Sequence, residues 1–181
     1  LSRAWMIPDG VETMCPAHKN GSCSGRGLRQ RVTRLYEATA YPAPVYVKDA
    51  AVHNVAAIAS GIARSGADII AIDGYRGGTG AAPTRIRDNV GIPIEMALAQ
   101  IDSRLREEGI RDNVSLVVGG SVRSSADVVT AIALGADACY VRPAALLAPG
   151  GHLCRSCHPG QCNRGMAPAP PQPLPRPNPA P

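Results

Sequence analysis

The sequence predicts an α/β protein built from about four strand–helix units around a parallel sheet. Short apolar runs rich in β-branched residues alternate with longer stretches of helical periodicity, and the apolar runs lack polar alternation, which is typical of strands covered on both faces. Residues 65–70 and 134–139 share one pattern, a glycine followed by alanine, aspartate and an apolar run. With 181 residues, the chain is too short for a complete parallel (β/α)8 barrel, which needs roughly 250.

The predicted core occupies residues 35–150 and contains all four strands. We expect the strands at residues 45–48, 68–73, 114–119 and 137–141. Their starts are 23, 46 and 23 residues apart, which indicates a strand–helix repeat with one long insertion. We expect the intervening helices at residues 53–65, 94–108 and 125–134.

Two local signals support these helix boundaries. Gly66 and Gly135 stand where a left-handed residue commonly ends a helix before the next strand begins. Ser124 and Asp127 have the spacing of a capping box, which predicts a helix start directly after the third strand.

The segments that flank the core have different compositions. Residues 1–34 are glycine-rich without steady periodicity, so we expect an irregular segment leading into a short helix. Residues 151–166 are rich in cysteine. Residues 167–181 contain eight prolines, which predicts a disordered tail of extended polyproline character.

Composition and charge exclude several classes of protein. The net charge is +5, but the arginines are scattered and aromatic residues make up only 3% of the chain, so we expect no nucleic-acid partner. Charged residues or glycines interrupt every apolar stretch before the ~20 residues of a membrane span, so we expect no membrane partner. The N-terminal residues lack the apolar core of a signal peptide, and we therefore expect a cytoplasmic protein.

In parallel α/β folds the chemistry lies at the carboxyl ends of the strands. The first strand is predicted to end at Lys48, a cation that needs an anionic partner if the strand is buried. The third runs into Gly119, Gly120 and Ser121, where backbone N–H groups before a helix can bind a phosphate, although a plain tight turn explains the same residues. Arg142 follows the fourth strand.

The segment after the second strand is unusual for its length. Residues 74–93 form a glycine-rich stretch without clear periodicity. Long irregular segments are uncommon inside a compact domain unless they line a site or cover it. We therefore expect residues 74–93 to contribute to a ligand site.

This stretch also carries a resemblance to a known family. Residues 67–83, Ala-Asp-Ile-Ile-Ala-Ile-Asp-Gly-Tyr-Arg-Gly-Gly-Thr-Gly-Ala-Ala-Pro, resemble the signature loop of the FMN-binding synthase domain of glutamate synthase large chains, especially the archaeal type. Further matching segments are 45–48, 51–54, 88–95, 117–121 and 131–137. The resemblance covers roughly residues 36–166. It implies the C-terminal half of an FMN-containing barrel, that is, a partial (β/α)8 barrel of the TIM type.

The resemblance also implies a reaction and a set of site residues. In that family, reduced flavin delivers a hydride to 2-iminoglutarate, which forms from 2-oxoglutarate and ammonia, and the product is L-glutamate. Lys48 would then be catalytic, beside the flavin or the keto acid. The expected cofactor-binding residues are Gly77, Gly78, Thr79, Gly80, Gly119, Gly120, Ser121 and Arg142. Inosine-monophosphate dehydrogenases have a similar loop with a nucleophilic cysteine, which residues 74–93 lack.

Three cysteines near the C-terminus form a candidate metal site. Cys154, Cys157 and Cys162 are spaced closely, as in proteins that bind a metal ion or an iron–sulfur cluster. The resemblance implies a cluster that passes electrons to FMN, but the family has a further cysteine where this chain has Gly151. Three thiolates leave two alternatives, a three-iron cluster or a zinc ion with a histidine as the fourth ligand.

Two functions remain open at this stage. The first is a fragment of a glutamate synthase-type oxidoreductase that is inactive alone, because half a barrel exposes two strand edges and lacks part of the flavin pocket. Its partners would be 2-oxoglutarate or 2-iminoglutarate, together with a chain that completes the barrel or an electron-donor subunit. The second is a non-catalytic remnant that binds a metal ion or an iron–sulfur cluster.

Overall fold

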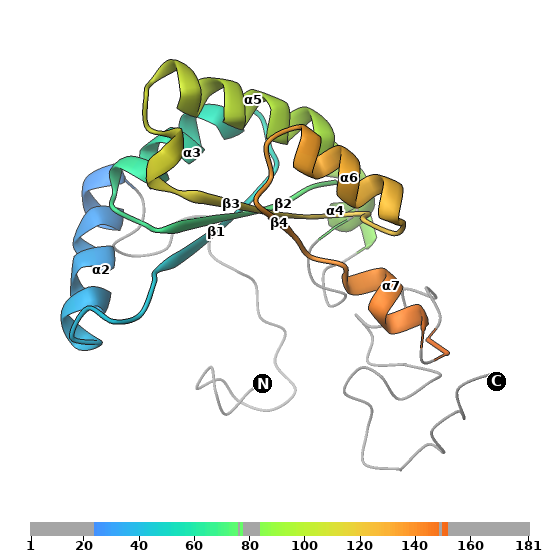
Figure 1. The fold of residues 1–181 in the computed structure, drawn as a ribbon, viewed down its shortest axis with the longest axis horizontal. Helices are drawn as coiled ribbons and strands as arrows, with labels where there is room; N and C mark the ends of the chain where they lie inside the picture. Colours follow the sequence, from blue (N-terminus) through green and yellow to red (C-terminus); the bar gives the residue numbers. More distant parts are fainter. Residues whose placement is uncertain (1–23, 76, 78–83, 149, 152–181) are drawn as a thin grey trace, which may run out of the picture.

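The computed structural model describes residues 24–75, 77, 84–148 and 150–151. It contains a four-stranded parallel sheet in the order β1-β2-β3-β4 (Figure 1). The strands are β1 (Tyr46–Ala50), β2 (Ile69–Asp73), β3 (Ser115–Gly119) and β4 (Ala138–Cys139). The helices are α2 (Gly25–Ala38), α3 (Val55–Arg64), α4 (Thr84–Asn89), α5 (Ile94–Glu107), α6 (Ser125–Ala133) and α7 (Arg142–Leu147), with a 3-10 turn, η1 (Arg111–Asn113). The predicted α/β class is confirmed, and the parallel sheet is compatible with part of a barrel.

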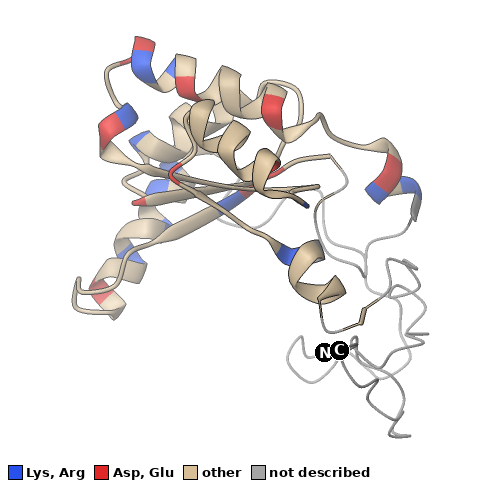
Figure 2. Ribbon diagram, turned by 45° about the vertical axis from the view of Figure 1, so that its right-hand side comes forward, with Lys and Arg blue, Asp and Glu red and all other residues tan. Residues whose placement is uncertain are grey.

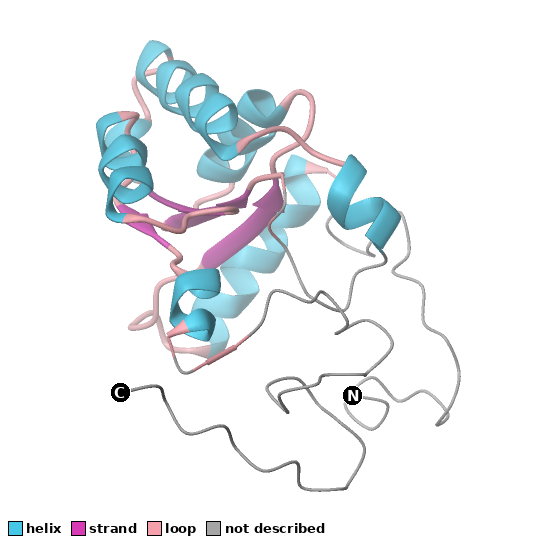
Figure 3. Cartoon of the chain, turned by 90° about the vertical axis from the view of Figure 1, so that its right-hand side faces the viewer, coloured by secondary structure: helices cyan, strands magenta, loops and turns pink. Residues whose placement is uncertain are grey.

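Helices α3, α5 and α6 lie together on one side of the sheet (Figures 1 and 3). The side chains that β2 and β3 direct to this side are almost fully buried. They pack against equally buried residues of the helices, and the largest members of this core are Ile70, Ile72, Leu98, Ile101, Leu105, Leu116, Val55 and Val118. Aliphatic side chains therefore form the core, as the scarcity of aromatic residues requires.

Burial on both faces holds for the central strands and fails for the outer ones. Ala71 of β2 and Val117 of β3 are buried on the face opposite the helices, whereas Tyr46 and Lys48 of β1 are exposed there. The prediction of four fully covered strands is therefore wrong for β1 and also for β4. Each of these strands lies at an edge of the sheet, so its side chains pack against a neighbouring strand on one side only.

Several elements differ from their predicted limits. The helix after the irregular N-terminal segment is longer than expected, because Ser24 accepts a hydrogen bond from Gly27 N (3.1 Å) and starts α2 within the glycine-rich stretch. Residues 74–93 contain the short helix α4. Strand β4 has two residues instead of five, and Arg142 already begins α7.

The repeated Gly-Ala-Asp pattern forms the same structure twice. Gly66 and Gly135 adopt φ angles of +90° and +108°, as expected for residues that end a helix. Asp68 accepts a hydrogen bond from Val45 N through its side chain (2.6 Å) and donates its own N–H to Val45 O (3.1 Å). Asp137 makes the same pair of bonds to Leu116, at 2.7 and 2.9 Å. Each aspartate therefore clamps the start of the neighbouring strand.

Two charged clusters connect the helices to each other and to the sheet. Glu108, after α5, accepts hydrogen bonds from Ser60 (2.5 Å) and Arg64 (2.8 Å) of α3, and from Arg104. Arg111 donates to Asp102 Oδ1 (2.8 Å) and Asp137 Oδ2 (3.0 Å). It also donates to the carbonyl oxygens of Val114 and Gly135, at 2.9 and 2.8 Å.

None of the helices in the described part of the chain has the length and apolar content needed to cross a bilayer.

Candidate functional site

Lys48 and Asp73 form an ion pair on the face of the sheet opposite α3, α5 and α6. The distance from Lys48 Nζ to Asp73 Oδ2 is 2.7 Å. Lys48 does not end its strand, because β1 continues to Ala50, which lies opposite Asp73 in the register. The Lys48 side chain is 51% exposed and that of Asp73 is 13% exposed. The prediction that Lys48 ends a buried strand is therefore wrong, but an anionic partner for its cation is present within the chain.

The Asp73 carboxylate lies among glycines from two loops. A Cβ atom on Gly77 would collide with Asp73 Oδ1, and one on Gly119 would lie 3.2 Å from the same oxygen. The absence of side chains at these two positions therefore makes room for the carboxylate. Asp73 was absent from the predicted site, although an acidic residue that ends an apolar strand before a glycine-rich loop is a signal that could have identified it.

The turn after β3 packs backbone to backbone against the loop after β2. Gly120 has a φ angle of +107°, and a Cβ atom there would lie 2.8 Å from Gly74 N and 2.9 Å from Gly74 O. Gly74 N donates a hydrogen bond to Gly119 O (2.8 Å). Gly77 also contacts this turn, because its Cβ would lie 3.0 Å from Gly120 Cα. Only glycine fits this approach, which brings the two predicted cofactor-binding loops together.

The backbone of this turn offers hydrogen-bond donors. Ser121 follows Gly120 with a φ angle of +63°, so two successive residues have left-handed backbones. Of the described residues, none accepts a hydrogen bond from the N–H groups of Gly120 or Ser121. The Ser121 hydroxyl lies 3.5 Å from Tyr75 O, to which it donates. The turn is therefore a candidate for binding an anion through its backbone.

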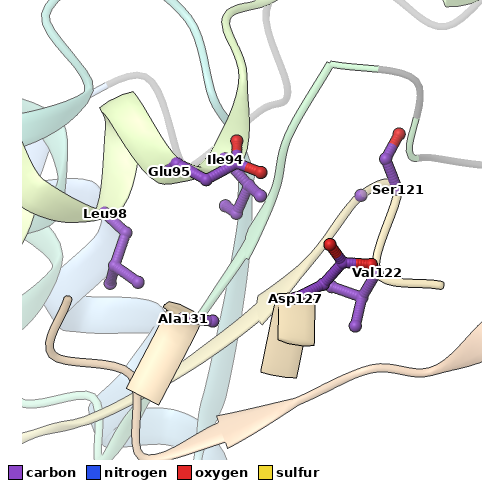
Figure 4. A pocket seen from close by; sticks show the side chains of 8 residues that line it. Ile94, Glu95, Leu98, Ser121, Val122, Asp127 and Ala131 are labelled. Atoms are coloured by element: carbon purple, nitrogen blue, oxygen red, sulfur yellow. The ribbon is translucent and has the colours of Figure 1, made fainter. Parts of the chain in front are cut away.

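A hollow behind the turn separates the starts of α5 and α6 (Figure 4). Its lining residues are Ile94, Glu95, Leu98, Gly120, Ser121, Val122, Asp127 and Ala131.

The Asp127 carboxylate accepts hydrogen bonds from the N–H groups of Arg123 (2.9 Å) and Ser124 (2.8 Å), and these bonds lower the pKa of Asp127. The predicted capping box is therefore present. Because Asp127 offsets the positive end of α6, a phosphate is better placed on the Gly120–Ser121 turn than at this helix end.

The remaining predicted site residues lie elsewhere. Arg142 is exposed and begins α7, which leads away from the sheet (Figure 1). Gly78, Thr79 and Gly80 lie outside the described residues, as do Cys154, Cys157 and Cys162. Within the part of the chain that is described, no three His, Cys, Asp or Glu residues are close enough together to hold a metal ion. The structure thus brings together Lys48, Gly77, Gly119, Gly120 and Ser121 and adds Asp73 to them.

Comparison with known proteins connects this arrangement to one family. A family model described as a conserved region in glutamate synthase matches residues 1–176. The archaeal glutamate synthase [NADPH] of Archaeoglobus fulgidus is 59% identical over 166 residues, which are 92% of this chain and 32% of that protein. The archaeal-type glutamate synthase [NADPH] of Thermotoga maritima is 56% identical over 172 residues, 95% of this chain and 34% of that protein.

A more distant relative comes from a plant. The chloroplastic ferredoxin-dependent glutamate synthase 2 of Arabidopsis thaliana is 35% identical over 158 residues, 87% of this chain and 10% of that protein. The chain thus spans about a third of the length of the archaeal-type relatives and a tenth of the plant relative.

Proposed function

The chain belongs to the glutamate synthase family, and from this premise we propose that it forms the flavin-binding half of a glutamate synthase-type oxidoreductase. The observation that carries the proposal is the contact of Gly120 with Gly74 and Gly77, next to the Lys48–Asp73 ion pair. Two loops meet here without intervening side chains, so backbone N–H groups are available to bind a phosphate. The Lys48 cation lies nearby.

The residues of this edge fit FMN as the cofactor. When bound, FMN would supply the hydride that converts 2-iminoglutarate, formed from 2-oxoglutarate and ammonia, into L-glutamate. The N–H groups of Gly120 and Ser121 would hold its phosphate. Gly77, followed by Gly78, Thr79 and Gly80 in the sequence, would let the backbone approach the flavin.

The charged residues have separate roles in this proposal. Lys48 supplies positive charge to the flavin or to a substrate carboxylate. Asp73 fixes the position of the Lys48 ammonium group through the 2.7 Å ion pair. Arg142, the first residue of α7, would add positive charge beyond the end of β4.

We further propose that the sheet is half of a (β/α)8 barrel. Strands β1 and β4 each have one unpaired edge within the described sheet, and a barrel closes when such edges pair with further strands. The rest of the archaeal-type relatives, about two thirds of their length, is long enough to supply them. Cys154, Cys157 and Cys162 would hold an iron–sulfur cluster on the route by which an electron-donor subunit reduces the flavin.

Cofactor content and turnover test this function. We expect the purified chain to be yellow and to release FMN on denaturation. We expect glutamate from 2-oxoglutarate, ammonia and chemically reduced FMN only after addition of a chain that carries the missing half of the barrel. Misplacement of the reacting atoms by about 1 Å costs roughly a hundredfold in rate, and half a pocket cannot prevent it. Colourless protein with stoichiometric zinc would support the metal-binding remnant, and turnover by the monomeric chain alone would refute the half barrel.

A further inference from the structure

Arg87 of α4 is a buried cation without hydrogen-bond partners on two of its nitrogens. Its side chain is only 8% exposed. Nε and Nη2 are both buried, and within the described part of the chain neither donates a hydrogen bond. The carboxylate of the next residue, Asp88, lies 3.6 Å from Nε, which is beyond hydrogen-bond distance.

Such an arrangement costs stability unless an anion completes it. A buried guanidinium loses its hydration, and only an anionic acceptor with good geometry restores what water supplied. Another arginine of the same short helix, Arg85, is exposed, as is usual for this residue type. The burial of Arg87 is therefore specific to its position.

The two nitrogens without partners form the edge of the guanidinium that binds carboxylates elsewhere in this protein. Arg64 directs its own Nε and Nη2 to Glu108 Oε2, at 3.3 and 2.8 Å. This edge is planar and matches two oxygens of a carboxylate or a phosphate. Arg87 has the same donors in place, and no described residue is their acceptor.

Hydrogen bonds connect α4 to the proposed flavin-binding edge. Tyr75 OH donates to Asp88 O (2.7 Å), and Tyr75 N donates to Ile92 O (2.8 Å). Tyr75 O in turn accepts the hydrogen bond from Ser121. The charged residues of α4 lie beyond the ends of the strands that carry the glycine loops (Figures 1 and 2). Asp88, the residue after Arg87, and Ser121 of the proposed phosphate-binding turn therefore both form hydrogen bonds with Tyr75.

We propose that Arg87 is the binding residue of an oxyanion subsite on α4, which hydrogen bonds of Tyr75 link to the Gly120–Ser121 turn, and that its Nε and Nη2 bind two oxygens of one anionic group. The presence of the subsite follows from the burial of Arg87. The identity of its ligand rests on the proposed function, which offers two sources of the same chemistry, a carboxylate of 2-oxoglutarate and the phosphate of FMN.

Thermal unfolding of the full chain tests the proposal with defined anions. The probes are 2-oxoglutarate and inorganic phosphate, each compared with sodium chloride at equal ionic strength. The variants are Arg87→Met, Arg87→Lys and the matched control Arg85→Met from the exposed side of α4. We expect one of the two anions to raise the unfolding midpoint of the wild-type chain by at least about 2 °C. A response to 2-oxoglutarate identifies the carboxylate and a response to phosphate identifies the cofactor group.

The variants separate binding from a structural role. In Arg87→Met we expect apparent anion affinity to fall at least about tenfold, and the midpoint without anion to stay unchanged or rise, because an unpaired buried charge is removed. Arg87→Lys keeps the charge but not the planar pair of donors, so it should bind more weakly than wild type, whereas Arg85→Met should match wild type.

Three results would overturn the subsite. They are a wild-type midpoint that neither anion raises above the chloride control, an unchanged response in Arg87→Met, and an Arg87→Met chain that unfolds several degrees earlier or fails to fold. Flavin content measured on the same preparations keeps the two proposals apart. Wild type without flavin but with an Arg87-dependent anion response contradicts the flavin proposal alone, and wild type with flavin but no such response contradicts the subsite alone.

Discussion

Lys48 on β1 and Asp73 on β2 are joined across neighbouring strands by an ion pair of 2.7 Å. The pair places a cation and an anion at the edge where the two glycine loops meet. Because Asp73 is held between Gly77 and Gly119, the carboxylate has little freedom to move, and it fixes the ammonium group rather than the reverse. The position of the proposed catalytic lysine therefore depends on a residue of the adjacent strand.

Asp73→Asn should release Lys48. We expect the Lys48 amine to react about threefold faster with an acylating reagent, because the ion pair no longer holds the side chain in place. Lys19, the other lysine of the chain, is the internal reference, and brief labelling followed by mass spectrometry gives the ratio. Asp112→Asn, at an exposed acidic residue of η1, is the control. An unchanged ratio in Asp73→Asn would show that the pair does not persist in solution.

Gly120→Ala should destabilise the chain by about 2 kcal/mol or more and lower its flavin content. Its left-handed backbone disfavours any side chain, and the added Cβ would press on Gly74. Gly61→Ala is the matched control, because nothing lies within 4 Å of that position in α3; alanine there should be neutral or stabilise by up to about 1 kcal/mol. Urea unfolding measures both effects. Equal stability of the two variants would refute the close contact between the loops.

Glu108→Gln should flatten the acid limb of the stability profile. Hydrogen bonds from Ser60 and then from Arg64 lower the pKa of Glu108 from 4.5 to about 2. A carboxyl whose pKa is lower in the folded state stabilises the fold above its unfolded pKa, and that contribution is lost as the pH falls from 4.5 toward 2. Denaturant unfolding across this range checks the loss. Glu107→Gln, at the exposed neighbour, should retain the wild-type slope.

Arg111→Met should cost about 3 kcal/mol of stability, because it removes hydrogen bonds that tie α5 to Val114, which precedes β3, and to the turn before β4. The Arg111 side chain is only 12% exposed and donates to four different residues. Arg106→Met is the control, since Arg106 pairs with the same Asp102 from a side chain that is 64% exposed. We expect a much smaller loss there by urea unfolding. Similar losses in both variants would mean that only the charge on Asp102 matters.

Much of the fold is predictable because local chemistry and packing agree. The apolar runs of β2 and β3 are buried by the sheet and the helices, and the capping box of Ser124 and Asp127 starts α6 where its spacing predicts. The limits of β4 could not be predicted, because Tyr140 and Val141 have strand-forming side chains and only the pairing with β3 decides where the strand ends. Helix α4 was missed because six residues carry too little periodicity.

The candidate site could be predicted only in part, for a related reason. Glycines at strand ends are visible in the sequence, and Gly120 does contact the loop that contains Gly74 and Gly77. The partner of Lys48 was not visible, because the pairing of Asp73 with it depends on the register of β1 against β2. Arg87 gave no signal at all, since burial of a single arginine in a short helix follows from tertiary packing.

The paired bonds of Asp68 and Asp137 have a consequence for synthesis on the ribosome. Each clamp joins residues only 23 and 21 positions apart, and the two do not share a residue. The first can therefore close once Asp68 has left the exit tunnel, while the segment that forms β3 is still inside. Emerging strands would be fixed one after another in their parallel order, and an incomplete chain on the ribosome would expose only its newest unpaired edge to aggregation.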